Sequence, residues 1–231
     1  MDVEFTKMHA AGNDFMVVDE TAGEVVPESG KNNFVARYCR RHFGVGADGA
    51  IFIQKSDSAD LKFHFFNPDG SIAEMCGNGI RCLAKYAFEK GLCKKNPLKV
   101  ETLAGILTLS MTVGGGRMLE VSVDMGAPRL KNGDIPVSGN PDDSTIEREV
   151  VAGGFEHAIT AVGMGNPHAV LFQNSIDLLD VLEVGARIRN STNIFPKGVN
   201  VHFVEKISEN EFGIRTYERG VEAETLACGT G

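Results

Sequence analysis

The sequence lacks the features that would place it in a membrane or export it from the cell. Its longest apolar runs are far shorter than the roughly 18 residues that a membrane-spanning helix needs. Its first residues, MDVEFTKMHAAGNDF, contain neither the apolar core of a secretory signal nor the Arg- and Ser-rich character of a transit peptide. We therefore expect a cytoplasmic protein that does not bind membranes.

Basic runs are missing as well. The chain has 23 Lys and Arg against 31 Asp and Glu, which gives a formal net charge of −8, and no basic stripe is interleaved with aromatic residues. Because such a stripe is the usual footprint of a nucleic-acid-binding surface, nucleic acid is not an expected partner. A small anionic substrate would have to be held by local hydrogen-bond donors rather than by the overall field of an acidic protein.

Cysteine is scarce, and the common cysteine motifs are missing. The chain has 5 cysteines in 231 residues, with no C-x-x-C pair and no H-E-x-x-H sequence. An odd number in a chain long enough to build a core favours reduced thiols over a disulfide framework. The spacing of His64, Cys76 and Cys82 fits no common zinc pattern, so we expect no metal site. Cys39, Cys82 and Cys93 fall in or just after apolar helical patterns, which predicts that they are small core residues.

The other two cysteines begin two nearly identical motifs. Residues 76–79 read CGNG and residues 228–231 read CGTG, with the cysteines 152 positions apart (228 − 76). Cysteine followed by Gly-x-Gly suits the start of a helix, where unpaired N–H groups can hold an anion. The helix dipole also lowers the pKa of a thiol placed there. We therefore predict a reactive thiol in each motif; the alternative is that both motifs are simple turns.

The two motifs belong to a longer internal repeat. Residues 12–15 (GNDF) resemble residues 165–168 (GNPH) at an offset of 153 (166 − 13). Residues 46–48 (GAD) resemble residues 198–200 (GVN) at an offset of 152 (200 − 48). Residues 66–67 (FN) resemble residues 217–218 (YE) at an offset of 151 (218 − 67). Together with the cysteines, these landmarks keep one order and nearly one separation, which predicts two copies of one fold unit.

Each copy predicts two strands, a helix and two more strands. In the first copy the patterns cover residues 4–8, 15–18, 33–42, 50–54 and 61–66. In the second copy they cover residues 158–162, 169–172, 176–188, 200–205 and 211–217. The first copy continues with a helix at 80–90, capped by Gly91, and with strands at 98–101, 105–113 and 118–124. This alternation predicts an α/β (α+β) fold with lobes at residues 1–130 and 131–231, joined over the surface by residues 132–144.

The second copy has no continuation to match. About 37 residues run from Cys76 to Val113 in the first copy, whereas three residues follow Cys228. The helix that the second thiol should begin is therefore not in the sequence, and we expect that roughly 35 to 45 residues are missing at the C-terminus. For the same reason we expect the 231-residue chain to be inactive or poorly folded by itself.

Four segments together closely resemble the diaminopimelate epimerase family: GNDF, NPDGSIAEMCGNGIRC, GNPHAV and ERGVEAETLACGTG. The resemblance covers residues 6–231, and the Asn that follows Cys76 and Gly77 separates it from proline racemases, which have His there. It implies two pseudo-symmetric lobes, each with mixed strands wrapped round a central helix and with the active site between them, the second lobe being truncated. It also implies a usually homodimeric, cofactor-independent enzyme that interconverts LL- and meso-2,6-diaminopimelate in lysine and peptidoglycan biosynthesis.

The resemblance implies a role for each matching residue. Cys76 and Cys228 are the implied catalytic thiols, with His168 and Glu218 beside them to tune ionisation and hold the substrate amine. The implied substrate-binding residues are Asn13, Asn67, Gly77, Asn78, Asn166, Asn200, Glu218, Arg219, Gly229 and Thr230. Amides offer both a donor and an acceptor to an ammonium–carboxylate pair, and Arg can fork onto a carboxylate. Each Asn taken alone could equally be a turn or cap residue.

Two thiols match the chemistry of inversion at an amino-acid Cα. Inversion needs a base on one face and an acid on the other, and one thiolate and one thiol can exchange these roles in the reverse reaction. No pyridoxal-phosphate motif is evident to absorb the electrons, and we expect no cofactor. Negative charge would instead be held by N–H groups around Gly77 and Asn78 and around Gly229 and Thr230.

Other functions fit parts of the sequence. A related racemase or isomerase of the same fold would act on proline, hydroxyproline or a phenazine precursor. A catalytically silent amino-acid binder would keep the pocket without the chemistry because of the missing C-terminus. A thiol redox sensor would join Cys76 and Cys228 in a reversible disulfide. The glycine-rich residues 44–49 lack the Lys-Ser/Thr ending of a phosphate-binding loop, so nucleotide binding is not expected.

Overall fold

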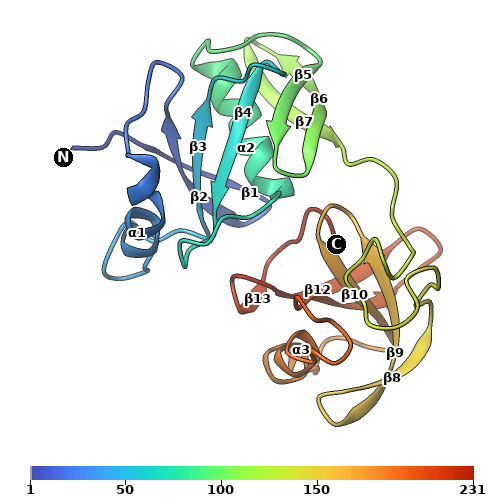
Figure 1. The fold of residues 1–231 in the computed structure, drawn as a ribbon. Helices are drawn as coiled ribbons and strands as arrows, with labels where there is room; N and C mark the ends of the chain where they lie inside the picture. The colour runs from blue at the N-terminus through green and yellow to red at the C-terminus, as the bar shows by residue number, and fades with distance from the viewer. Residues whose placement is uncertain (1) are drawn as a thin grey trace. The chain divides into compact units, whose positions relative to one another are not determined.

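The protein was analysed as a computed structural model that describes residues 2–231. The chain forms two compact units, unit 1 up to Met125 and unit 2 over Gly126–Gly231. Each unit contains one sheet (Figure 1). Buried apolar residues form two clusters in unit 1 and one in unit 2 among the described residues. The division lies five residues before the predicted lobe boundary at residue 130 (130 − 125).

Unit 1 has a seven-stranded sheet in the order β1-β2-β3-β4-β5-β6-β7. Its strands are β1 (Thr6–Ala10), β2 (Asn13–Asp19), β3 (Ala50–Gln54), β4 (Leu61–Phe66), β5 (Leu98–Thr102), β6 (Gly105–Gly114) and β7 (Arg117–Asp124). Helix α1 (Glu28–Tyr38) connects the parallel pair β2 and β3, and helix α2 (Gly77–Glu89) connects the parallel pair β4 and β5. These crossovers are needed because parallel strands cannot be joined by a tight hairpin.

The central strands of unit 1 are apolar on both faces because a helix covers each face. Phe15 and Ile51 belong to the cluster that packs against α2, whereas Met16 and Phe52 belong to the cluster that packs against α1. Successive strand residues point to opposite faces, so strands covered on both sides become nearly continuous apolar runs. This is why the strands predicted at 50–54 and 61–66 coincide with β3 and β4.

Helix α2 follows from its spacing of apolar residues. Ile80, Leu83, Ala84 and Ala87 are buried at intervals of three and four, which places them on one face of the helix. Gly91 adopts a φ of 74°, the left-handed conformation that commonly ends a helix. The prediction for residues 80–90 is therefore confirmed, except that the helix begins three residues earlier (80 − 77).

Unit 2 has a six-stranded sheet in the order β13-β12-β11-β10-β9-β8. Its strands are β8 (Arg148–Ala152), β9 (Phe155–Gly163), β10 (Pro167–Gln173), β11 (Asn200–Lys206), β12 (Phe212–Glu218) and β13 (Ala223–Thr225). Helix α3 (Val181–Arg189) connects the parallel pair β10 and β11. The core beside α3 contains Ala169, Leu171, Val201 and Phe203 from the central strands.

The strand pairing confirms the internal repeat. Strands β1 to β4 pair in the pattern antiparallel, parallel, antiparallel, and β9 to β12 repeat it with α3 in the place of α1. Met16 pairs with Ala50 as Ala169 pairs with Val201, so β3 and β11 are offset by 151 positions (201 − 50) rather than the predicted 152. Over residues 126–231, the described chain has no counterpart of α2.

Several predicted boundaries are wrong for identifiable reasons. Helix α3 begins at Val181 rather than at residue 176 because the Asp180 side chain accepts a hydrogen bond from Glu183 N at 2.9 Å and caps the helix there. Helix α1 ends before the predicted residue 42, since His42 has a φ of 72°. Strands β8 and β13 were not predicted.

The sequence suggested that residues 132–144 connect the lobes over the surface, but the structure shows that they do not. They lie inside unit 2, where Asn132 and Ile135 are buried. The Asn132 side chain also accepts a hydrogen bond from Thr145 Oγ1 at 2.9 Å. The polar and glycine-rich composition of this stretch therefore reflects its turns, and the composition alone did not reveal the buried contacts that these turns make.

Candidate functional site

Cys76 stands at the start of α2, as its motif predicts. It is the N-cap residue, with extended backbone angles (φ −140°, ψ 111°), and its Sγ accepts a hydrogen bond from Gly79 N at 3.4 Å. Gly77 and Asn78 form the first turn of the helix and are buried. The thiol therefore lies among the backbone N–H groups that a helix leaves without intrahelical partners.

Asn13 lies beside this helix start and is tied to it. Its Oδ1 accepts a hydrogen bond from Asn78 Nδ2 at 2.6 Å, and its Nδ2 donates to Asp48 Oδ2 at 3.1 Å. Arg81 in turn donates from Nη1 to Asn78 Oδ1 at 2.9 Å. A carboxylate can only accept and a guanidinium can only donate, so the two ends of this chain fix the orientation of both amides.

A group of charges lies behind Asp48. Arg41 Nη2 lies 2.8 Å from Asp48 Oδ1 and 2.6 Å from Asp14 Oδ1, and Lys7 Nζ lies 2.8 Å from Asp14 Oδ2. Burial of Asp14 opposes its ionisation, but hydrogen bonds from Arg41 and Lys7 and their positive charges outweigh that cost and lower its pKa to about 2. The sequence does not identify Asp48 as a site residue, because its only visible signal there is its place in the repeat.

Asn67 occupies the turn that follows β4. Its backbone N donates to Ser71 O at 2.8 Å, its Nδ2 donates to Ser71 Oγ at 3.0 Å, and its O accepts from Gly70 N at 2.9 Å. Gly70 has a φ of 86°, and a Cβ there would collide with the Asn32 carbonyl. These contacts are those of a turn residue, so a contact of Asn67 with substrate remains a prediction.

The other cysteines of unit 1 are core residues, as expected. Cys39 and Cys82 are each 2% exposed, and burial raises the pKa of both thiols to about 12. Cys93 is half-buried and packs against the same cluster as Cys82. His64 Nε2 pairs with Glu28 Oε1 at 2.8 Å, on the α1 side of the sheet. A zinc site that joins His64 to Cys82 is therefore not formed.

In unit 2, His168 begins a chain of buried polar side chains. His168 Nε2 lies 2.7 Å from Asn166 Oδ1, and His168 Nδ1 lies 2.7 Å from His202 Nε2. His202 Nδ1 lies 2.9 Å from Thr216 Oγ1. His168, His202 and Thr216 are each at most 2% exposed. Each ring nitrogen in this chain therefore has a hydrogen-bond partner.

Both imidazoles are held neutral. Burial lowers the pKa of His168 to about 3, helped by the positive charges of His202 and Arg219, and burial lowers the pKa of His202 to about 4. A neutral imidazole has one N–H and one acceptor nitrogen. Because Asn166 presents an oxygen, His168 carries its proton on Nε2 and accepts at Nδ1 from His202, which in turn accepts from Thr216.

Asn200, Glu218 and Arg219 lie at neighbouring strand ends. Asn200 Nδ2 donates to Pro167 O at 3.1 Å, and Asn200 Oδ1 accepts from Arg219 N at 2.9 Å. Arg219 Nη1 donates to Lys197 O at 3.2 Å, and Glu218 is the last residue of β12. The buried Asn200 amide therefore holds the start of β10 and the end of β12 together. Its contact with substrate stays a prediction.

Cys228 lies close to this polar chain. Its Sγ is 3.6 Å from Thr230 Oγ1, and the backbone N–H groups of Thr230 and Gly231 also donate to it. Gly229 and Thr230 are half-buried. Burial of the thiol and the negative charge of Glu218 nevertheless raise the pKa of Cys228. The predicted lowering is wrong for this thiol, because residues 226–231 form no helix whose dipole could favour the thiolate.

His168, His202 and Cys228 also form a set of possible metal ligands. One ligand atom from each lies within 4.8 Å of the others. All four imidazole nitrogens already take part in hydrogen bonds, so a metal ion would have to displace at least one of them. We therefore interpret the set as a pair of hydrogen-bonded imidazoles with a thiol nearby.

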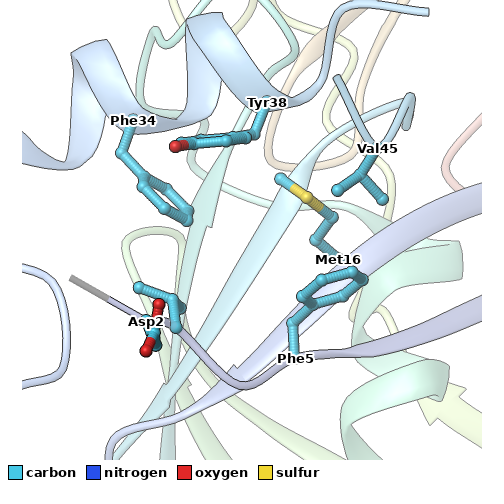
Figure 2. A pocket seen from close by; sticks show the side chains of 7 residues that line it. Asp2, Phe5, Met16, Phe34, Tyr38 and Val45 are labelled. Carbon is cyan, nitrogen blue, oxygen red and sulfur yellow. The ribbon is translucent and has the colours of Figure 1, made fainter.

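A cavity of about 250 Å³ in unit 1 is separate from the Cys76 thiol. Figure 2 shows its lining between α1 and the N-terminal strands, with Phe34 and Tyr38 from the helix facing Phe5 and Met16. Its remaining lining residues are Asp2, Val3 and Val45. Met16 points to the α1 face of the sheet, whereas Cys76 packs in the cluster on the α2 face. The cavity therefore does not expose the predicted catalytic thiol.

Comparison with known proteins gives consistent results over nearly the whole chain. Residues 5–131 and 160–231 match the sequence profile of a family described as "Diaminopimelate epimerase". A protein of this name from Methanocaldococcus jannaschii is 47% identical over an alignment of 243 positions, which covers 99% of this chain and 81% of that protein. One from Archaeoglobus fulgidus is 46% identical over 231 residues, which cover 100% of this chain and 79% of that protein.

Solved structures of low sequence identity share the fold. A hydroxyproline epimerase from Agrobacterium vitis matches with a TM-score of 0.74 at 15% identity, covering 98% of this chain and 73% of that one. A probable proline racemase from Agrobacterium radiobacter matches with a TM-score of 0.68 at 16% identity, covering 94% of this chain and 70% of that one. At such identities the matches show a mixed α+β fold of two lobes and do not identify a substrate.

Proposed function

This chain belongs to the diaminopimelate epimerase family, and we propose that it interconverts LL- and meso-2,6-diaminopimelate with Cys76 and Cys228 as its two acid/base groups. This activity makes it an isomerase of lysine and peptidoglycan biosynthesis. The observation that carries the two-thiol assignment is the repeat itself. Each copy of the fold unit places a cysteine among backbone N–H donors after the same series of strands.

Unit 1 supplies one half of the proposed chemistry. Gly77 lacks a Cβ and Asn78 is locked by Asn13, so the first turn of α2 forms a rigid set of N–H donors beside Cys76. Donors fixed in advance stabilise a developing negative charge without reorganising during the reaction. We assign Cys76 as a proton carrier, and Asn13, Asn67, Gly77 and Asn78 as substrate-binding residues.

Unit 2 supplies the other half. The charge of Glu218 acts on the Cys228 thiol, which favours the protonated form of that sulfur. His168 donates its Nε2–H to Asn166 Oδ1, so it orients this substrate-binding amide and is not a base for the thiol. We assign Cys228, His168 and Glu218 to the acid/base chemistry, and Asn166, Asn200, Glu218, Arg219, Gly229 and Thr230 to substrate binding.

The proposed reaction is a proton exchange at one carbon. The thiolate of one cysteine takes the Cα proton, and the electron pair left on the carbon is stabilised by N–H donors around the substrate carboxylate. The thiol of the other cysteine delivers a different proton to the opposite face, which inverts the centre. The first cysteine ends as the thiol and the second as the thiolate, so the reverse reaction uses them in exchanged roles.

Location and assembly are part of the proposal as well. Among residues 2–231, no helix is both long and apolar enough to cross a membrane. We propose a cytoplasmic enzyme that forms a homodimer, in line with the family resemblance, and that has a small amino acid rather than a macromolecule as its partner.

Isotope labelling tests the proposed reaction. The enzyme is incubated with LL-diaminopimelate in D₂O, and the two stereoisomers are separated and analysed by mass spectrometry at early times. We expect one deuteron at the inverted Cα of the meso product while the remaining substrate is still unlabelled, because the delivered deuteron comes from a second, solvent-exchanged thiol.

Other outcomes of this experiment identify the alternative functions. Exchange with proline or hydroxyproline, and none with diaminopimelate, would assign a different racemase. Binding of diaminopimelate without any isotope exchange would indicate a silent binder, and simultaneous labelling of substrate and product would replace the two-thiol scheme with a single base.

Asp48→Asn should weaken substrate binding through Asn13. The Asp48 carboxylate accepts from Asn13 Nδ2 at 3.1 Å and from Asp14 N through Oδ2, and from Arg41 Nη2 through Oδ1. An amide of the same shape has one oxygen, so its NH2 group must face the donors on one of these two sides. We expect KM to rise about tenfold, and the free energy of unfolding to fall by about 1–3 kcal/mol, because a buried donor loses its acceptor. Steady-state kinetics and urea unfolding measure both effects. Asp57→Asn, at an exposed position, is the matched control, and an unchanged KM in Asp48→Asn would remove Asp48 from the site.

A further inference from the structure

The internal repeat provides a comparison for the buried histidines of unit 2. Val17 pairs with Ile51 as Val170 pairs with His202, so His202 takes the place that Ile51 has in unit 1. By the same pairing, His168 and Thr216 take the places of two phenylalanines. These equivalent positions are Phe15 for His168, Ile51 for His202 and Phe65 for Thr216.

In unit 1 the three equivalent positions are all apolar. Phe15 and Phe65 stack edge to face at 5.9 Å between centroids, and both pack in the cluster beneath α2 together with Ile51. The fold unit therefore does not need polar groups at these positions. Burying three polar side chains there costs stability unless each is hydrogen-bonded, so their presence in unit 2 points to a role other than packing.

The hydrogen bonds in unit 2 run in one direction. Thr216 Oγ1 donates to His202 Nδ1, His202 Nε2 donates to His168 Nδ1, and His168 Nε2 donates to Asn166 Oδ1. The direction is set by the carbonyl oxygen at one end and by the neutral state of each ring. If the donor at His202 is removed, the proton of His168 is free to move to Nδ1.

We propose that His202, supported by Thr216, is a positioning residue that holds His168 in the Nε2–H tautomer at the Cys228 half-site. This rests on the proposed function, because the hydrogen bond from His168 to Asn166 matters for catalysis only if Asn166 and Cys228 act on the substrate. The tautomer of a site histidine is commonly set by the hydrogen bond that its other nitrogen makes. Asn166 accepts at Nε2, but its amide can turn the NH2 group toward the ring if the proton moves to Nδ1. The N–H of His202 therefore decides which nitrogen of His168 carries the proton.

Three substitutions separate positioning from packing. His202→Leu removes the donor and fills the space with the kind of side chain that unit 1 has there. His202→Gln can place its amide Nε2 near the position of the imidazole Nε2 and so restores a donor to His168. Thr216→Val keeps the shape of the threonine and removes the hydroxyl that faces His202 Nδ1. Urea unfolding first establishes that each variant is folded.

The primary measurement is the tautomer of His168, read by long-range ¹H–¹⁵N correlation spectra of the imidazole rings at neutral pH. We expect protonated Nε2 and unprotonated Nδ1 in the wild type and in His202→Gln, and a mixture of both tautomers in His202→Leu and Thr216→Val. A single Nε2–H tautomer that persists in both His202→Leu and Thr216→Val would overturn the proposal.

Steady-state kinetics of the enzyme give the second measurement. We expect kcat of His202→Leu to fall at least about tenfold while KM stays within about twofold, and His202→Gln to recover kcat to within about threefold of wild type. Equal losses of kcat in His202→Leu and His202→Gln would also overturn the proposal. The tautomer measurement needs no turnover, so a protein that fails to epimerise diaminopimelate would refute the proposed function and leave this inference testable.

Discussion

Cys76→Ala and Cys228→Ala should each abolish epimerisation. General acid/base catalysis by a positioned side chain contributes about 10²- to 10⁴-fold, and inversion cannot proceed when one face has no proton carrier. We therefore expect kcat to fall by at least about 10³-fold in either variant. Binding should persist, because the N–H donors of α2 belong to the backbone and Asn78 keeps its bond to Asn13.

The other cysteines supply the controls for this experiment. Cys82→Ala changes a thiol in the same helix as Cys76, but one that is 2% exposed and whose pKa burial raises to about 12. Cys39→Ala does the same on the α1 side of the sheet. Both controls should lose some stability from the smaller side chain and keep kcat. Wild-type-like turnover in Cys76→Ala or Cys228→Ala would exclude the two-thiol mechanism.

Acidification from pH 6.5 to 4.5 removes stability through the two buried histidines of unit 2. In the unfolded chain His168 and His202 take up protons near their ordinary pKa of 6.5, whereas in the folded chain their pKa values are about 3 and about 4. The unfolded state therefore binds more protons across this window. As a result, the free energy of unfolding decreases as the pH is lowered. The expected slope is about 1.4 kcal/mol per pH unit for each histidine.

His157 and, near the acid end of the window, Glu20, Glu28 and Glu222 also have lowered pKa values and add to the slope, so the contribution of His202 is read from the difference between wild type and variant. Asp14 has its pKa lowered to about 2 from an ordinary value of 3.8, so its contribution is present above pH 4 and is lost below it. Urea unfolding at several pH values between 6.5 and 4.5 measures the slope. His202→Gln should have a smaller slope by about 1.4 kcal/mol per pH unit, since one titrating ring is gone. Identical slopes in wild type and variant would show that His202 is not held neutral in the folded protein.

Much of the fold could be predicted from the sequence because its signals are local. The apolar runs of β3 and β4, the spacing of Ile80, Leu83 and Ala87, and Gly91 after α2 each reflect the conformation of a few neighbouring residues. The start of α2 at Cys76 follows from the same kind of signal. The repeat could also be predicted, since it requires only that motifs recur at a constant separation.

The tertiary structure alone decided how the site residues are connected. Asp48 reaches Asn13 across 35 positions and His202 reaches His168 across 34, and these contacts depend on the pairing of parallel strands around a helix. The state of Cys228 also depends on its surroundings, because burial and the charge of Glu218 raise the pKa that its motif was expected to lower. The sequence therefore determined which residue types recur in each lobe. Strand register determined which of these residues share a hydrogen bond, because only register sets the distance between side chains that are far apart in the chain.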